Sequence, residues 1–144
     1  LSQKKPDMAL LRYHDTIFEA LQKIPPATSN NKVLNCDWYF GAFIIYERPD
    51  LHFVDALDAR TLQFYDSKKF ELNRHMKLGH VKELNKAVQV FKADYVLCDE
   101  DVLNQQLAAD KSFELIYKPE AKMVFGEPFV SPIRLFRRLP EGQP

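Results

Sequence analysis

The segment from Val33 to Tyr65 constrains the fold of this chain most strongly. An apolar run at 33–36 is followed by an aromatic-rich helix predicted over Trp38 to Glu47, and then by a second apolar run at 51–54. This order, with charged residues after the second strand, is typical of a βαβ unit with parallel strands. The run 42–46 is short and wholly apolar, so periodicity also allows a strand there.

The remaining predicted elements follow from periodicity, capping residues and proline. A helix over Asp7–Ile24 is capped by Asp7 and stopped by Pro25 and Pro26. Further along the chain we expect an amphipathic helix over His80–Phe91, then a strand over Tyr95–Cys98 and a helix over Val102–Ala109. A hairpin follows, made of Phe113–Lys118 and Lys122–Gly126 and joined by Pro119-Glu120. The last strand is expected over Ile133–Leu139.

Together these elements predict a single soluble α/β domain over residues 1–144, with flexible ends at 1–6 and 140–144. The expected architecture is a three-layer αβα Rossmann-like sandwich, with a mainly parallel sheet and antiparallel edge strands. Right-handed crossovers place the first strand in the middle, beside the second and third. The chain begins at Leu1 rather than Met, so we expect a processed protein or a fragment.

Composition and motifs argue against several functional classes. Twenty basic residues balance twenty acidic ones, so there is no charge excess to indicate a nucleic-acid partner. The four glycines form neither GxGxxG nor a phosphate loop, and the four histidines show no metal-ligand spacing. We therefore expect no cofactor, no metal and no catalytic residue within this chain.

The two cysteines, Cys36 and Cys98, fall near the ends of predicted neighbouring strands. They are too few for a disulfide framework or a zinc site. Two separate buried thiols are the simpler expectation. A disulfide is the alternative if the compartment is oxidising and the Cα atoms lie within about 7 Å.

Polar and aromatic residues follow the first two predicted strands, and we expect them to form a ligand or acceptor rim. In open α/β sheets the binding crevice lies beyond the carboxyl ends of the strands. Each residue also has a structural alternative: a helix cap, a core aromatic or an ion-pair network that holds the loop. The candidate rim residues are Asp37, Trp38, Asp55, Asp58 and Arg60.

The order of several short motifs resembles a known family. The motifs are Asp37-Trp38-x-x-Gly41-Ala-Phe-Ile-Ile-Tyr46, Phe53-Val54-Asp55 with Asp58-Ala59-Arg60, Ala93-Asp94-Tyr95-Val96-Leu97, and Phe113-Glu-Leu-Ile-Tyr117 followed by Met123-Val124-Phe125. They resemble the extracytoplasmic C-terminal domain of multi-spanning membrane glycosyltransferases of the C type. More distantly, the segment at 37–41 is similar to the WWDYG motif of oligosaccharyltransferase catalytic subunits. Tyr39 stands where that motif has its acidic residue, so its acceptor role is not carried over.

The resemblance implies an accessory domain that is catalytically inert alone, in a protein using polyprenyl-phosphate sugar donors. The catalytic carboxylates would lie in loops between membrane helices, outside this chain. Implied partners are the membrane-embedded portion of the same protein and an acceptor substrate or protein. The implied location is the extracytoplasmic face of a membrane, periplasmic or exterior.

Two other classes of function remain open. A protein-interaction domain without a small ligand predicts an exposed apolar patch. A stand-alone Rossmann-like enzyme predicts nucleotide binding near Cys36 and Asp55, and the missing glycine turn argues against it.

Overall fold

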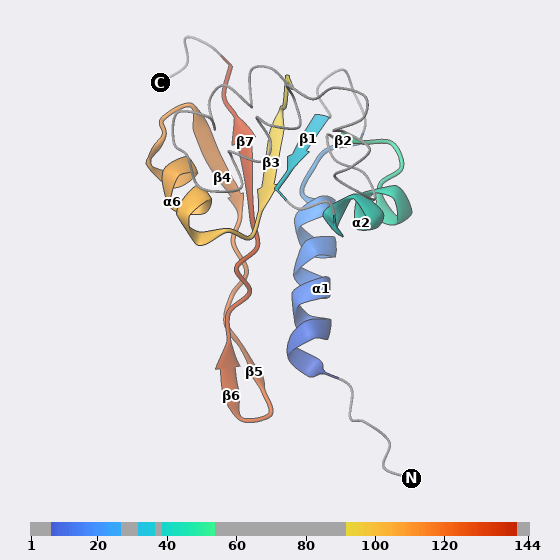
Figure 1. Ribbon diagram of the computed structural model, residues 1–144, viewed down its shortest axis with the longest axis vertical. Helices are drawn as coiled ribbons and strands as arrows, with labels where there is room; N and C mark the ends of the chain where they lie inside the picture. Colours follow the sequence, from blue (N-terminus) through green and yellow to red (C-terminus); the bar gives the residue numbers. More distant parts are fainter. Residues whose placement is uncertain (1–6, 27–31, 37–38, 54–91, 141–144) are drawn as a thin grey trace.

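The structure, a computed structural model, describes residues 7–26, 32–36, 39–53 and 92–140. The fold is α/β, with a five-stranded mixed sheet, a separate two-stranded sheet and three described helices. The described elements are α1 (Met8–Gln22), β1 (Lys32–Asn35), α2 (Tyr39–Glu47), β2 (His52–Phe53), β3 (Tyr95–Cys98), α6 (Asp101–Ala109), β4 (Phe113–Tyr117), β5 (Lys122–Val124), β6 (Glu127–Phe129) and β7 (Arg134–Arg138) (Figure 1). The helix expected over His80–Phe91 lies outside the described residues.

Helix α1 begins and ends where its sequence predicts. The Asp7 side chain accepts a hydrogen bond from the Leu10 backbone N–H at 3.1 Å, which satisfies one of the free donors of the first turn. The helix ends at Gln22, shortly before the two prolines. Its buried apolar face contains Ile17, Ala20 and Leu21, spaced three and four residues apart as a helix face requires.

The main sheet has the strand order β2-β1-β3-β7-β4. Strand β1 is parallel to both of its neighbours, with Val33 opposite Phe53 on one side and Tyr95 on the other. Strand β1 therefore lies between β2 and β3, as the crossover argument predicts. Strands β7 and β4 are antiparallel to their neighbours, so half of the four strand pairings are antiparallel. The described sheet is therefore mixed rather than mainly parallel.

Helices pack on both faces of the main sheet. Side chains alternate along each strand, so Val33, Leu97 and Leu135 share one buried cluster with residues of α1 and α2. Their neighbours Leu34, Val96 and Phe136 join the opposite cluster, which contains Leu103 and Leu107 of α6. The run at 42–46, for which a strand was the alternative, belongs to helix α2. This helix contributes Phe40 and Ile44, both fully buried.

The predicted hairpin around Pro119-Glu120 is wrong. Strand β4 pairs with β7 in the main sheet, with Glu114 opposite Arg137, and not with β5. Strand β5 instead pairs with β6, and the two-residue turn between them is Phe125-Gly126, whose φ angles are 51° and 81°. Pro119 marks the point where the chain leaves the main sheet. Figure 1 shows the result: a narrow arm, made of β5, β6 and the segments leading to them, that extends from the main sheet on the side where α1 begins.

Candidate functional site

The five residues predicted to form a rim, Asp37, Trp38, Asp55, Asp58 and Arg60, all lie outside the described residues. Their gathering at the carboxyl ends of the strands therefore stays a prediction. The structure does describe the strand ends from which that rim would extend. Strand β4 is antiparallel to β7, as β3 is, so β1, β3 and β4 all end at the same edge of the sheet. The arm leaves the main sheet from this edge.

A disulfide joins Cys36 and Cys98 at this edge. The preceding residues, Asn35 and Leu97, are register partners on β1 and β3, and the Cα atoms of the two cysteines are 5.1 Å apart. Both cysteines are buried. Of the two expectations from the sequence, the structure has the disulfide and not the separate thiols. The bond fixes the carboxyl ends of two neighbouring parallel strands to one another.

Polar groups next to the disulfide connect the strand ends to α1 and to α6. The Tyr13 hydroxyl on α1 donates a hydrogen bond to the Asp99 carboxylate at 2.7 Å. On the other side, the Asn104 amide donates to the backbone carbonyls of Cys98, at 3.4 Å, and Pro132, at 3.1 Å. The buried Asn104 side-chain oxygen has no hydrogen-bond partner in the described part of the chain. These hydrogen bonds fix the strand ends relative to the neighbouring elements. Most buried polar groups in proteins are hydrogen-bonded in this way.

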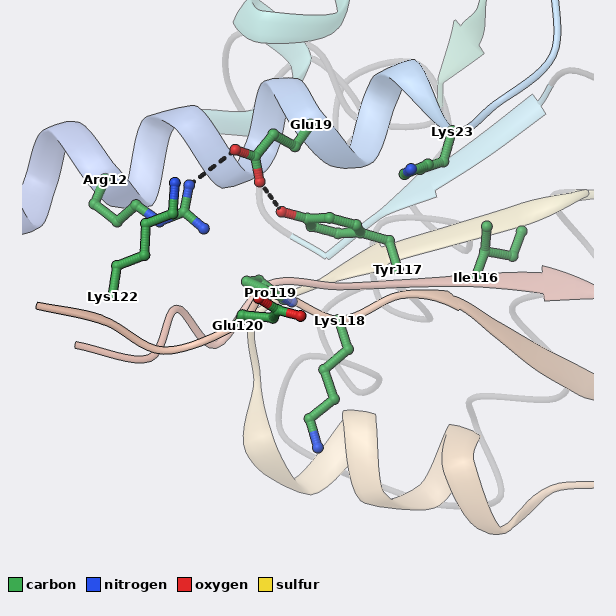
Figure 2. Close-up of a pocket in the computed structure, with 9 residues that line it drawn as sticks. All are labelled: Arg12, Glu19, Lys23, Ile116, Tyr117, Lys118, Pro119, Glu120 and Lys122. Atoms are coloured by element: carbon green, nitrogen blue, oxygen red, sulfur yellow. Dashed lines mark hydrogen bonds and ion pairs between the residues drawn. The ribbon is translucent and has the colours of Figure 1, made fainter. Parts of the chain in front are cut away.

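A pocket of about 400 Å³ lies between α1 and the start of the arm. Figure 2 shows Glu19 at its centre: Arg12 donates to one carboxylate oxygen at 2.8 Å, and the Tyr117 hydroxyl donates to the other. The pocket is lined by Arg12, Glu19, Lys23, Ile116, Tyr117, Lys118, Pro119, Glu120 and Lys122. Four of these side chains are basic and two are acidic, so the pocket has an excess of two positive charges.

The electrostatics of this cluster indicate a structural bridge. The hydrogen bond from Tyr117 lowers the pKa of Glu19, and Arg12 adds to the effect, while burial opposes it. Burial, followed by the hydrogen bond to Glu19, raises the pKa of Tyr117. General acid–base catalysis needs a pKa near the working pH, and both groups are moved away from neutrality. The hydrogen bond between Tyr117 and Glu19 joins β4 to α1.

No sequence pattern pointed to this cluster. Glu19 and Tyr117 are 98 residues apart and belong to no recognisable motif. The only indication of the cluster in the sequence is the spacing of Arg12 and Glu19. They are seven residues apart and therefore share one face of α1.

A second pocket, of about 430 Å³, surrounds Arg48 and Asp50. The Arg48 guanidinium donates to the backbone carbonyls of Leu21 and Ile24, each at 2.7 Å, and to Pro25 at 3.0 Å. It also pairs with both carboxylate oxygens of Asp50, whose hydrogen bond raises the pKa of Arg48. Arg48 thus fixes the segment that follows α1, and its donors are occupied by these contacts.

The fold and these clusters define an α/β domain whose parallel strand ends are fixed by a disulfide. Within the described ranges, no helix is long and apolar enough to cross a membrane, and no three His, Cys, Asp or Glu residues are grouped to hold a metal ion. Comparison with family models, curated proteins and solved structures finds no match for this chain.

Proposed function

We propose that this chain is an extracytoplasmic accessory domain of a multi-spanning membrane glycosyltransferase-like protein that uses polyprenyl-phosphate sugar donors. The disulfide between Cys36 and Cys98 is the observation that carries the proposal. Disulfides persist in oxidising compartments such as the periplasm and the cell exterior, and they are rare in the cytosol. The bond therefore supports the extracytoplasmic location that the family resemblance implies.

The geometry of the sheet edge adds support. The disulfide lies at the edge from which the arm extends, and α1 begins at the same end of the long axis as the β5–β6 turn (Figure 1). A membrane-embedded portion preceding α1 would turn this edge toward the bilayer, where the domain would cover the catalytic site or position an acceptor. The finer architecture belongs to the same proposal: a three-layer αβα Rossmann-like sandwich, supported by helices on both faces of the sheet.

The proposed role requires no chemistry of the domain itself. The carboxylate and phenol of the pocket, Glu19 and Tyr117, have pKa values shifted away from neutrality in opposite directions. That is consistent with a domain that is inert alone and works through its membrane-embedded partner.

The test is the orientation of the full-length gene product. Alkaline phosphatase fused after Pro144 folds to an active enzyme only outside the cytoplasm, whereas green fluorescent protein at the same position fluoresces only inside it. We expect active phosphatase, no fluorescence, and recovery of the product in the membrane fraction. Fluorescence from a product in the soluble fraction, with alkylatable Cys36 and Cys98 thiols, would refute the proposal.

A second candidate is a protein-interaction domain without a small ligand. Exposed apolar side chains on the arm favour it, since Met123 and Phe125 are both largely accessible. The same fusions separate the two candidates, because an independent interaction domain does not require membrane spans in its gene product.

A further inference from the structure

Arg12 forms a buried wall of the pocket of about 400 Å³ around Glu19, here called the Glu19 pocket. The residue is only 9% exposed, and a buried charge is costly unless it is paired and hydrogen-bonded. Glu19 accepts a hydrogen bond from the guanidinium at 2.8 Å, and Tyr117 donates to the other oxygen of that carboxylate. A guanidinium carries five N–H donors, and in the described part of the chain no nitrogen of Arg12 is both fully buried and without a partner. Glu19 therefore fixes the Arg12 side chain, whose remaining donors are open to solvent or to a ligand in the pocket.

The Glu19 pocket offers acceptors as well as donors. Glu120 lines it, is exposed and has no ion-pair partner in the described ranges, and the same is true of Lys23. Lys122 interacts with the Glu19 carboxylate, whereas Figure 2 shows Lys118 pointing away toward α6. Three basic and two acidic side chains thus remain around the cavity. An ion of either sign would meet like charge there, so the pocket suits a neutral ligand that both donates and accepts hydrogen bonds.

Apolar surface lies beside these polar groups. Ile116, the ring of Tyr117 and Pro119 line the same pocket, and the first two also pack against the buried cluster shared with α1 and α2. Small-ligand sites combine such apolar surface with a few fixed polar groups, and a volume of about 400 Å³ is within their usual range. A sugar ring divides in the same way, with hydroxyl groups around its rim and C–H groups on its faces.

We propose that the Glu19 pocket binds a neutral saccharide, with Arg12, Lys23 and Glu120 hydrogen-bonded to its hydroxyl groups and the Tyr117 ring against a C–H face. The inference deepens the proposed function and rests on it for one point, namely that this saccharide is the acceptor that the domain positions. Binding of this kind needs no proton transfer, so it agrees with the structural role of the hydrogen bond between Tyr117 and Glu19.

The test is an NMR titration of the 144-residue chain with the methyl glycosides of glucose, mannose and N-acetylglucosamine. We expect at least one glycoside to shift the backbone amide signals of Lys23, Tyr117 and Glu120 in a saturable way. Its affinity should not change when the salt concentration is raised, because salt screens interactions between charges and this ligand has none. Inorganic phosphate, an anion, and free glycine, a zwitterion, should leave the same signals unchanged.

A pair of variants locates the binding in the Glu19 pocket. Glu120→Ala should weaken binding of that glycoside about fivefold, the loss expected for one hydrogen bond to an exposed charged group. Glu127→Ala is the matched control and should leave the affinity unchanged, because Glu127 is an exposed residue of β6 that does not line the pocket. Both side chains are exposed, so neither variant loses packing in the core.

Three results would overturn the inference: no saturable shift with any glycoside, saturable binding of phosphate or glycine at the same residues, or equal affinity of the wild type and Glu120→Ala. The fusion experiment separates this inference from the proposed function. Active phosphatase fusions without glycoside binding would overturn the inference and leave the proposed function standing. Glycoside binding by a cytoplasmic gene product would retain the saccharide pocket and refute the proposed function.

Discussion

Cys36 and Cys98 are 62 residues apart in the sequence, and a disulfide joins them across two neighbouring parallel strands with their Cα atoms 5.1 Å apart. The bond therefore closes a long loop at the edge of the sheet. In the chain-entropy description, a disulfide stabilises the native state by restricting the unfolded chain, and the effect increases with loop length.

Removing this bond should destabilise the fold substantially. We expect Cys36→Ser/Cys98→Ser to lower the free energy of unfolding by about 2–5 kcal/mol, measured by urea denaturation. A reducing agent should lower the stability of the wild type and leave the double variant unchanged. Equal stability of the oxidised and reduced wild type would mean that the bond contributes nothing to the fold.

The hydrogen bond from Tyr117 to Glu19 is the contact that joins β4 to α1 in the pocket. Hydrogen bonds to charged groups contribute about 1.5–3 kcal/mol, and the exposure of Glu19 reduces this, so Tyr117→Phe should cost about 1 kcal/mol. The pKa of Glu19, followed by NMR titration, should rise in the variant because its largest lowering influence is lost. Tyr46→Phe is the matched control, since Tyr46 is exposed on α2 and the loss of its hydroxyl should leave the Glu19 titration unchanged. An unaltered Glu19 pKa in Tyr117→Phe would contradict the contact.

The same carboxylate should make stability depend on pH in the acid range. The folded pKa of Glu19 is lowered from its ordinary value of 4.5, so the folded state favours the ionised form. The stabilisation is complete above the unfolded pKa and is lost as the pH falls through the folded pKa. Denaturation measured between neutral pH and acid should show this loss in the wild type and a smaller loss in Glu19→Gln. Parallel pH profiles for the two proteins would exclude the contribution of Glu19.

The sequence predicted the parallel part of the sheet because its signals are local. The runs at 33–36 and 95–98 are short and largely apolar, which is typical of buried parallel strands. The position of β1 between β2 and β3 then followed from crossover handedness.

The arm and the pocket depend on long-range pairing, which leaves no local signal. Pro119-Glu120 looked like a hairpin turn, but β4 pairs with β7, the strand that follows the arm. The actual turn contains Phe125, a residue that propensity would not place at positive φ. Likewise, Leu10 lies seven residues before the buried Ile17, at the spacing of one helix face, yet it is exposed. The spacing of apolar residues does not disclose which part of a helix the rest of the fold covers.

The strain at Phe125 gives a prediction about stability. Residues other than glycine, asparagine and aspartate lose about 1 kcal/mol in the left-handed region, so Phe125→Asn should raise the free energy of unfolding by up to about 1 kcal/mol.

Gly126→Ala is the matched comparison. A Cβ at Gly126 would meet nothing within 4 Å, so its cost of about 1 kcal/mol would report backbone strain at φ 81° alone. Urea denaturation of both variants measures the two effects. If Phe125→Asn is less stable than the wild type, the ring supports the turn through contacts of its own, and its exposure is not kept for an external surface. If it is more stable, the aromatic ring at the tip of the arm costs the fold free energy, and its presence there is not explained by packing within the chain.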